Sequence, residues 1–564
     1  MTSTIKLLDS LAVPSAFSRH ETITDRGVLD DLYTWKTKSL TVLASLSVLD
    51  ICSLELTEQA HLVRVLAPLT ATAEWTSPDS RRIATALLLK LTPIHSLITH
   101  TLAHVVKPLF APSPHPRLHT STARVLTRPA DTQDAYHYQP WKEHPGLEEV
   151  IRYCLLNIEP SAYDSTWPLL LPPVMSFLDD YQVPFKVLGV RLVSDMLARV
   201  PPDLLIRTGV DALLFTSLTN AFNYLRDPST PELLRVTVPT TLQLIDITTP
   251  SSSHTCSIAS RASLGSQAVY QTNTKALATR FTRLSTLLSS FLLGTVIMYT
   301  PTVLPPNPVN VSADPLTESG TSTTGPDEYA PSDIPECTIT QASTHKQDMR
   351  APNPTLVAAA QTLPSVFTAL GIGGARFLKG IMPVLAEWLT LPIPIPVCIS
   401  DQSSDSNTVL AYSQGSCTSA YALHLASLSS LSVLMQTCAV RMGRWAPTVV
   451  DAISRCWVGC FDAHSESQRS HGPSETCAAR DRGDIKAFKF LRTRLREMAI
   501  ALADVCPSVV VNEYLRLLEF DQVLFGGLVG GIGAPSKDGG HPGYTADTNK
   551  DKCKSTDEAN ACHT

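Results

Sequence analysis

Cys456 and Cys460 stand one helical turn apart and are followed by three further metal-binding residue types, at His464, His471 and Cys477. Four such side chains could hold a zinc ion. Cys456 also shares an apolar helical stripe with Ile453 and Trp457, and a free cysteine in such a stripe behaves as a small buried hydrophobe. We favour the buried interpretation and expect no metal ligands, while Cys456, Cys460 and His464 leave the zinc alternative open.

Asp179 and Asp180 form an adjacent pair of carboxylates that could suggest acid/base chemistry. Neighbouring residues of a helix point in different directions, so the two groups cannot easily share one substrate. Because the pair ends an apolar helical run, we interpret it as a turn or helix-boundary feature.

Basic and aromatic residues in the C-terminal half could contact a partner. KAFKFLRTRLRE at 486–497 aligns its cations roughly along one face, which fits either an acidic partner or a solvated helix side. RMGRWAP at 441–447 lies at an expected helix junction, and tryptophan and arginine are favoured in interfaces, although tryptophan also fills cores. The expected partner-binding residues are Trp388, Arg444, Trp445, Lys486, Lys489 and Arg496.

Catalytic signatures are missing from the sequence. It contains no G-x-S-x-G, H-E-x-x-H, phosphate-binding G-x-x-x-x-G-K-[ST] or C-x-x-C pattern. GIGG at 371–374 precedes an expected helix without a strand before it, so a loop or cap is favoured over a nucleotide site. FGGLVGGIG at 525–533 is interpreted as a helix stop. We expect no enzymatic activity and no cofactor.

Composition limits the class of protein. The chain has 564 residues, 44% hydrophobic and 17% charged, with a formal net charge of −6, so nothing draws it generally to nucleic acid. Its 13 cysteines lack disulfide-framework spacing, which fits reduced thiols inside a cell. The apolar run at 284–299 is interrupted by Ser and Thr and is favoured as a buried helix over a membrane span.

Helical periodicity runs through nearly every structured segment, and strand-like alternation is almost absent. From Trp167 to Tyr181, apolar residues recur three and four positions apart, and a second such run extends from Phe185 to Val200, with Gly189 on the same face. A glycine there lets a neighbouring helix come close. The pattern predicts an all-α chain that contains a pair of antiparallel helices joined by a tight turn.

The first of these helices carries a proline in its interior. Pro173, Asp180 and Lys186 have about the spacing of the kinking proline, the turn aspartate and the second-helix base of a HEAT repeat. FLKGIMPVLAEWLTLP at 377–392 is a second candidate repeat. We therefore predict a HEAT-like solenoid, an α-α superhelix.

Three segments break the helical pattern with Pro-, Ser-, Thr- or charge-rich sequence that cannot bury enough apolar surface to order itself. The expected organisation is an N-terminal helical region at 1–107, a flexible linker at 108–145, central HEAT-like repeats at 146–300, a disordered insertion at 301–354, C-terminal HEAT-like repeats at 355–533 and a disordered tail at 534–564.

WPLLLPPVMSFLDDYQVPFKVLGVRLVSDMLARVPPDLLIRTGVDALLFTSLTNAFNYL resembles the central block of the family of the second Tel-interacting protein, a subunit of the TTT (Tel–Tti–Tti) complex. The resemblance rests on the tryptophan before the proline-containing helix, the LDD turn, the K-x-x-G and the RTG before LLF. The residues concerned are Trp167, Pro173, Asp179, Asp180, Lys186, Gly189, Arg207 and Gly209. LKGIMPVLAEWL and RMGRWAPTVVDAISRCW resemble its C-terminal helices.

This resemblance implies a non-enzymatic scaffold that works with two large helical solenoids and with heat-shock chaperone machinery. Such a scaffold helps to mature and stabilise phosphatidylinositol-kinase-related protein kinases (PIKKs), which serve DNA-damage checkpoints, telomere maintenance and nutrient signalling. It implies a location in cytoplasm and nucleus, without direct contacts to nucleic acid or membrane. The repeats alone would equally permit a transport or cargo adaptor of the importin type, whose signature is binding to a small GTPase.

Overall fold

The computed structural model describes most of the helical sequence. The described residues are 7–17, 25–48, 51, 54–92, 94–127, 139–249, 266–300, 352–393, 407–470 and 478–532. The predicted insertion at 301–354, apart from 352–354, and the predicted tail lie outside these ranges. The organisation expected for them stays a prediction.

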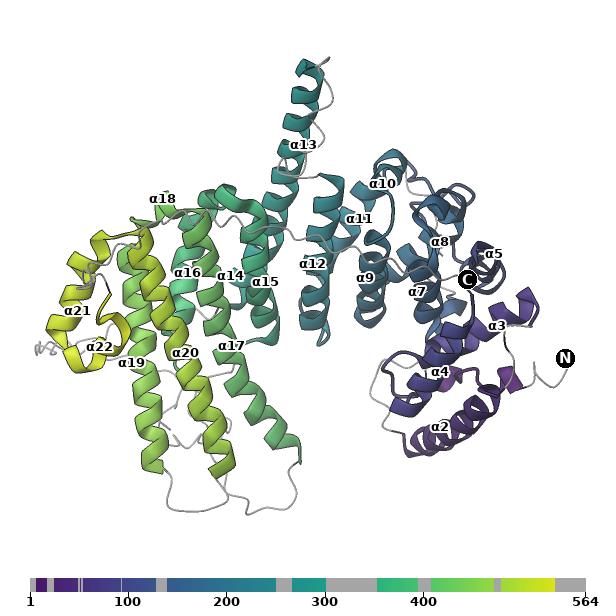
Figure 1. The fold of residues 1–564 in the computed structure, drawn as a ribbon, viewed down its shortest axis with the longest axis horizontal. Helices are drawn as coiled ribbons and strands as arrows, with labels where there is room; N and C mark the ends of the chain where they lie inside the picture. Colours follow the sequence, from purple (N-terminus) through teal and green to yellow (C-terminus); the bar gives the residue numbers. More distant parts are fainter. Residues whose placement is uncertain are drawn as a thin grey trace, which may run out of the picture.

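Helices follow one another along the whole described chain (Figure 1). The N-terminal ones are α2 (Arg26–Leu46), α3 (Leu56–Leu66), α4 (Pro78–Lys90), α5 (His95–His100) and α6 (Lys107–Phe110). The central ones are α7 (Leu147–Asn157), α8 (Tyr163–Leu178), α9 (Val183–Leu197), α10 (Pro202–Thr208), α11 (Val210–Thr219), α12 (Thr230–Thr248), α13 (Ser266–Thr286) and α14 (Leu293–Tyr299). The C-terminal ones are α15 (Pro354–Leu370), α16 (Leu378–Thr390), α17 (Asn407–Thr437), α18 (Ala439–Met442), α19 (Ala446–Ser470), α20 (Ala478–Val505), α21 (Leu515–Phe520) and α22 (Gln522–Val529).

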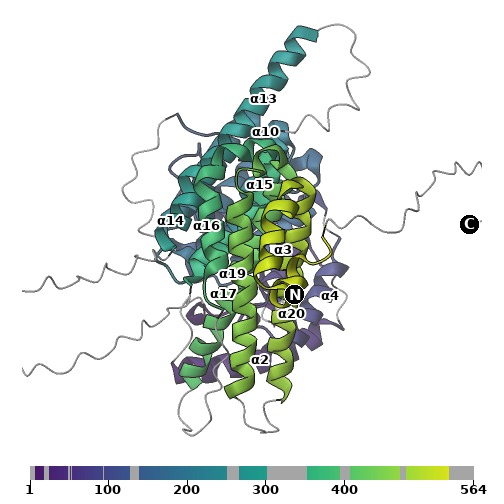
Figure 2. The same cartoon turned by 90° about the vertical axis from the view of Figure 1, so that its left-hand side faces the viewer.

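The helices stack into an elongated solenoid, which confirms the predicted fold class (Figure 1). α8 packs on α9, α9 on α12, α12 on α15, α15 on α17, and α17 and α19 on α20. A view turned by 90° shows α13 projecting from one edge of the stack, as it does in Figure 1 (Figure 2). Within the described ranges, β-structure is limited to one isolated bridge between Leu118 and Val125.

The buried side chains form two core clusters that follow each other along the stack. The first runs from Leu8 to Leu244 and the second from Phe222 to Val529, so they overlap at α12. Since α12 packs directly on α15, the stacking passes across the 301–354 segment without a break. The change of core therefore falls inside the predicted central repeats and not at the predicted insertion.

The α8–α9 pair is held at a very short distance by Gly189. A Cβ at that position would lie 2.3 Å from the backbone nitrogen of Leu178, at the end of α8. The expected close approach of a helix to Gly189 is thus confirmed. α8 keeps Pro168, Pro172 and Pro173 inside a single helix of 16 residues, and the side chain of Pro173 is buried.

The predicted flexible linker at 108–145 is wrong for its described parts. Phe110, Leu118 and Trp141 are buried in the first core cluster, and Trp141 is only 1% exposed. Pro140–Glu143 forms a 3₁₀ turn before α7. Proline and histidine are frequent in this segment, but a few large apolar side chains are enough to fix it. Residues 128–138 lie outside the description.

Two stretches are long and apolar enough to cross a membrane by length and composition, Thr274–Tyr299 and Pro354–Thr390. The second is two helices, α15 and α16, joined by a 3₁₀ segment at Gly371–Phe377. In the predicted buried helix at 284–299, Leu284, Leu288 and Leu292 are buried against the second cluster.

Candidate functional site

Asp180, at the turn between α8 and α9, is fully buried and fixes that turn by polar contacts. Its Oδ1 accepts a hydrogen bond from the backbone N–H of Gln182 at 2.8 Å, and Lys142 Nζ lies 2.7 Å from its Oδ2. At this distance the ammonium and the carboxylate form an ion pair. Burial lowers the pKa of Lys142, and the Asp180 charge opposes that effect.

Asp179 binds two side chains from other parts of the chain. His115 Nε2 and Ser217 Oγ each lie 3.0 Å from its Oδ2. His115 Nδ1 accepts the backbone N–H of Arg117 at 3.3 Å, so Nε2 carries the proton and donates to Asp179. Burial alone would raise the pKa of Asp179, but these two hydrogen bonds hold it below its usual value.

Lys186 completes this buried polar group from the first turn of α9. Its side chain is 2% exposed, and its Nζ donates to the carbonyl oxygen of Leu178 at 2.5 Å. The ammonium lies 5.1 Å from the centroid of the Tyr224 ring, and burial lowers its pKa. Each of the two adjacent aspartates therefore has its own structural contacts around this turn, which agrees with their interpretation as a turn feature.

The other residues of the predicted repeat signature, Trp167, Arg207 and Gly209, also have roles in packing, chain geometry or surface pairing. Trp167 is 2% exposed, and Gly209 ends α10 with a φ of +73°, a conformation that favours glycine. Arg207 pairs with Asp164 on the exposed surface. The repeat signature thus marks a well-packed helix junction.

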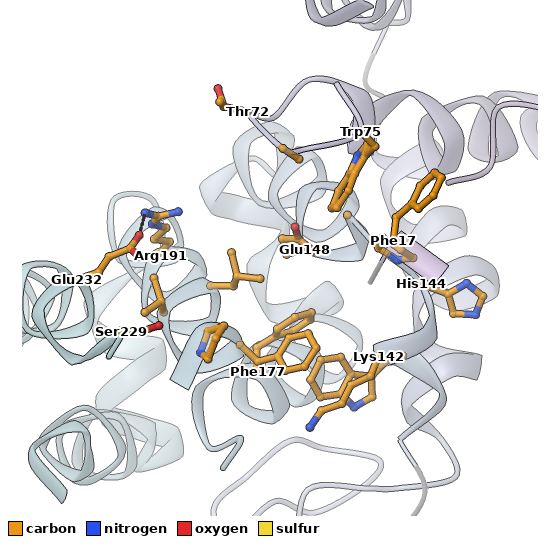
Figure 3. A pocket seen from close by; sticks show the side chains of 18 residues that line it. Phe17, Thr72, Trp75, Lys142, His144, Glu148, Phe177, Arg191, Ser229 and Glu232 are labelled. Atoms are coloured by element: carbon orange, nitrogen blue, oxygen red, sulfur yellow. Dashed lines mark hydrogen bonds and ion pairs between the residues drawn. The ribbon is translucent and has the colours of Figure 1, made fainter. Parts of the chain in front are cut away.

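A cavity of about 280 Å³ opens between the N-terminal helices and the start of the central repeats (Figure 3). We call it the Glu148 cavity. Figure 3 shows Glu148 between Trp75 on one side and Phe177 on the other, with the Arg191–Glu232 pair at a third side. Its further lining includes Phe17, Trp141, Lys142, His144, Phe185 and Ser229.

Pro68 determines how the two sides of this cavity meet. Gly146 has a φ of +79°, and a Cβ there would lie 2.4 Å from Pro68 Cβ, so only glycine lets α7 begin this close. Trp75 Nε1 donates to the carbonyl oxygen of Pro68 at 3.1 Å. One proline therefore holds both the tryptophan and the helix start that carries Glu148.

Glu148 is the unusual charge of the cavity. It is partly buried, and burial raises the pKa of its carboxyl to about 7, against a smaller opposite effect of a backbone hydrogen bond. Nearby Glu149 raises it further. At neutral pH the carboxylate is therefore held at a free-energy cost that a nearby cation would reduce.

Two predicted partner-binding residues are engaged inside the molecule. Trp388 is fully buried in the second cluster, and its Nε1 donates to Thr300 Oγ1 at 3.3 Å. Arg496 donates to the carbonyl oxygens of Gly527 and Gly530, at 2.6 and 3.2 Å, near the end of α22. Both residues are corrected to structural roles, because a core position and a helix-end contact use the groups that a partner would need.

The other predicted partner-binding residues differ in placement. Arg444 is exposed and Trp445 is half-buried, at the junction before α19, and Lys489 is exposed on α20. Lys486 belongs to α20, but its side chain lies outside the described part. Within the described residues Arg444 forms no ion pair.

Only two of the five residues considered as zinc ligands have described side chains. Cys456 and Cys460 are buried in the second cluster, whereas the side chains of His464, His471 and Cys477 lie outside the description. Among the described residues, no three His, Cys, Asp or Glu side chains gather as a metal site. GIGG behaves as a cap, since Gly371 ends α15 with a φ of +54°.

Several residues of these sites were not singled out from the sequence. His115, Lys142 and Ser217 come from segments 38 to 64 residues from the aspartates they contact, as for Ser217 and His115 with Asp179. No local spacing signals such contacts. For Glu148 the sequence offers one local indication of its position: a glycine comes shortly before it, and acidic residues are typical of the first turn of a helix.

Comparison with known proteins places the chain in a family. The Tti2 family model matches residues 62–395, more than half of the chain. No curated protein matches the sequence. Among solved structures, the chain is similar to one from "Kap95p Binding Induces the Switch Loops of RanGDP to adopt the GTP-bound Conformation: Implications for Nuclear Import Complex Assembly Dynamics", at 10% identity and a TM-score of 0.28, covering 95% of this chain and 61% of that one. At this TM-score the likeness carries no argument, and it is on the family match that the chain is placed: it belongs to the Tti2 family.

Proposed function

We propose that this protein is a non-enzymatic scaffold subunit of the TTT complex. The observation that carries the proposal is the family match over 62–395, which includes the whole α8–α9 junction. The described part also consists of stacked helices, a fold that binds partners through extended surfaces. The titratable groups at its best-defined junction are engaged in structural contacts.

The finer role follows from the family resemblance. We propose that the protein acts with two large helical solenoids and heat-shock chaperones to mature and stabilise PIKK-family kinases, in cytoplasm and nucleus. DNA-damage signalling, telomere maintenance and nutrient signalling would then depend on it through those kinases.

One exposed edge of the solenoid supports partner binding. Ile372 and Val440 are 68% and 91% exposed at two neighbouring helix junctions, next to half-buried Trp445. The two junctions touch, since Cys438 Sγ lies 3.9 Å from the carbonyl oxygen of Gly371. The same two junctions carry four exposed cations, Arg376, Lys379, Arg441 and Arg444. We call this the Arg444 edge, and it suits a partner with apolar and acidic side chains.

A tagged pull-down from the native cell at moderate salt, with mass spectrometry of the co-purified proteins, tests the proposed function. We expect two large helical solenoids and one or more giant kinases in amounts above those from an untagged strain. Depletion of the protein should also lower the steady-state level of those kinases. Recovery of a transport GTPase, or of no stable partner, would overturn the proposal and favour a cargo adaptor.

A further inference from the structure

The Glu148 cavity contains four charged side chains, and three of them are already neutralised. Lys142 is paired with Asp180 at 2.7 Å, and Arg191 is paired with Glu232 at 2.6 Å. Among the residues that the structure describes, Glu148 forms no ion pair. The cavity as a whole therefore presents one uncompensated negative charge.

Aromatic rings form much of the wall around this charge. Trp75, Phe177 and Phe185 line the cavity, and the face of an aromatic ring attracts cations. The wall already shows this property, because Lys142 Nζ lies 4.8 Å from the centroid of the Phe185 ring and 5.3 Å from that of the Trp141 ring. A carboxylate among such rings favours a cation with an apolar stem.

We propose that the Glu148 cavity binds a basic side chain, arginine or lysine, carried by a protein partner. A volume of about 280 Å³ accommodates one such side chain with its stem between the rings and its charge at Glu148. The scaffold function proposed above supplies only the expected identity of the partner. The chemistry of the cavity is independent of it.

A purely structural role at the start of α7 explains Glu148 less well than binding of a cation does. Acidic residues are favoured in the first turn of a helix, and Glu148 is the second residue of α7. Its neighbour Glu149 occupies the same turn but lies 3.6 Å from Arg152, within ion-pair distance. Helix capping therefore accounts for an acidic turn, but not for a carboxylate left without a cation beside aromatic rings.

The binding is expected to depend on pH. The charged or titratable groups around Glu148 are Glu149 on α7, Lys142 and His144 on the preceding segment, Arg191 on α9 and Glu232 on α12. Burial lowers the pKa of His144, so it is neutral where the cavity binds best. Since burial raises the pKa of Glu148 to about 7, acidification removes the charge that holds the ligand.

The test is a titration of the full-length protein with N-acetyl-arginine amide, observed by ligand-detected NMR. A ligand of this size supports a Kd of about 1 mM. We expect binding at pH 8 that weakens about tenfold or more at pH 5.5. N-acetyl-citrulline amide, which has nearly the same shape without the charge, should bind at least about tenfold more weakly at pH 8.

Two variants complete the experiment. Glu148→Gln should lose the preference for arginine over citrulline, and Glu143→Gln, an exposed neighbour outside the lining, should keep it. Equal binding of both amides to the wild type, undiminished arginine binding by Glu148→Gln, or no binding of arginine amide at about 50 mM would each overturn the proposal. A pull-down that recovers the expected solenoids would leave the scaffold function standing in all three cases, so the two failures are distinguishable.

Discussion

At the residue scale, the cost of burying a charge links the Glu148 cavity to stability. The pKa of Glu148 is about 7 in the folded protein and near 4.5 when unfolded, so the folded state binds more protons between these values. Stability should therefore fall as pH rises from about 4.5 to 7. This dependence is the reverse of that given by a carboxylate in an ion pair.

Glu148→Gln should remove this dependence. We expect the variant to match the wild type near pH 4.5 and to exceed it at pH 8 by up to about 3 kcal/mol. Urea unfolding followed by circular dichroism at both pH values measures the difference. Glu143→Gln serves as the exposed control and should show no such gain. An unchanged pH profile in Glu148→Gln would show that burial does not perturb this carboxyl.

Replacing Asp180 is expected to lower stability, whereas Glu148→Gln raises it, because Asp180 is already paired. Asp180→Ala leaves the Lys142 ammonium and the Gln182 N–H without their buried partner. We expect a loss of about 3–5 kcal/mol in unfolding free energy at pH 7. Asp203→Ala, at an exposed position in the first turn of α10, should cost less than about 1 kcal/mol. Comparable losses in the two variants would contradict a buried structural pair.

At the element scale, α8 and α9 pack so closely that Gly189 admits no side chain. Gly189→Ala places a Cβ 2.3 Å from the backbone of Leu178 and must push the helices apart, at a cost of about 3 kcal/mol. Gly380→Ala, in α16 with nothing within 4 Å, should instead stabilise by about 0.5–1 kcal/mol. Thermal unfolding of both variants checks the contrast in sign. If Gly189→Ala were neutral, the close packing would be refuted.

Element types could be predicted from the sequence, because helical periodicity is a local property. The runs beginning at Trp167 and Phe185 became α8 and α9 as expected. The 108–145 segment was mispredicted because composition averages over a region, whereas single residues such as Trp141 determine whether it is anchored. His115 shows the same limit, since its role depends on Asp179, 64 residues away.

At the scale of the whole molecule, family and fold class could be predicted, but the exposure of a side chain could not. Trp388 and Trp445 both fall on C-terminal helical sequence, yet Trp388 is buried and Trp445 is half-buried. The difference depends on which helices pack next to each residue. Arg496 likewise looked solvent-facing on its own helix, and the later residues Gly527 and Gly530 bind it. Periodicity within one helix contains no information on those neighbours.

At the scale of the assembly, we expect the Arg444 edge to contact the partner solenoids. Arg444→Ala/Trp445→Ala should weaken co-purification of the partner solenoids about tenfold or more, because arginine and tryptophan supply much of the energy of an interface. Helix content should be unchanged, because Arg444 is exposed and Trp445 is half-buried. Arg455→Ala, which breaks an exposed pair with Asp451 within α19, is the matched control and should leave partner binding intact. If the double variant unfolds instead, Trp445 belongs to the core and the edge is not the interface. If it stays folded and binds fully, the partners contact another face of the solenoid.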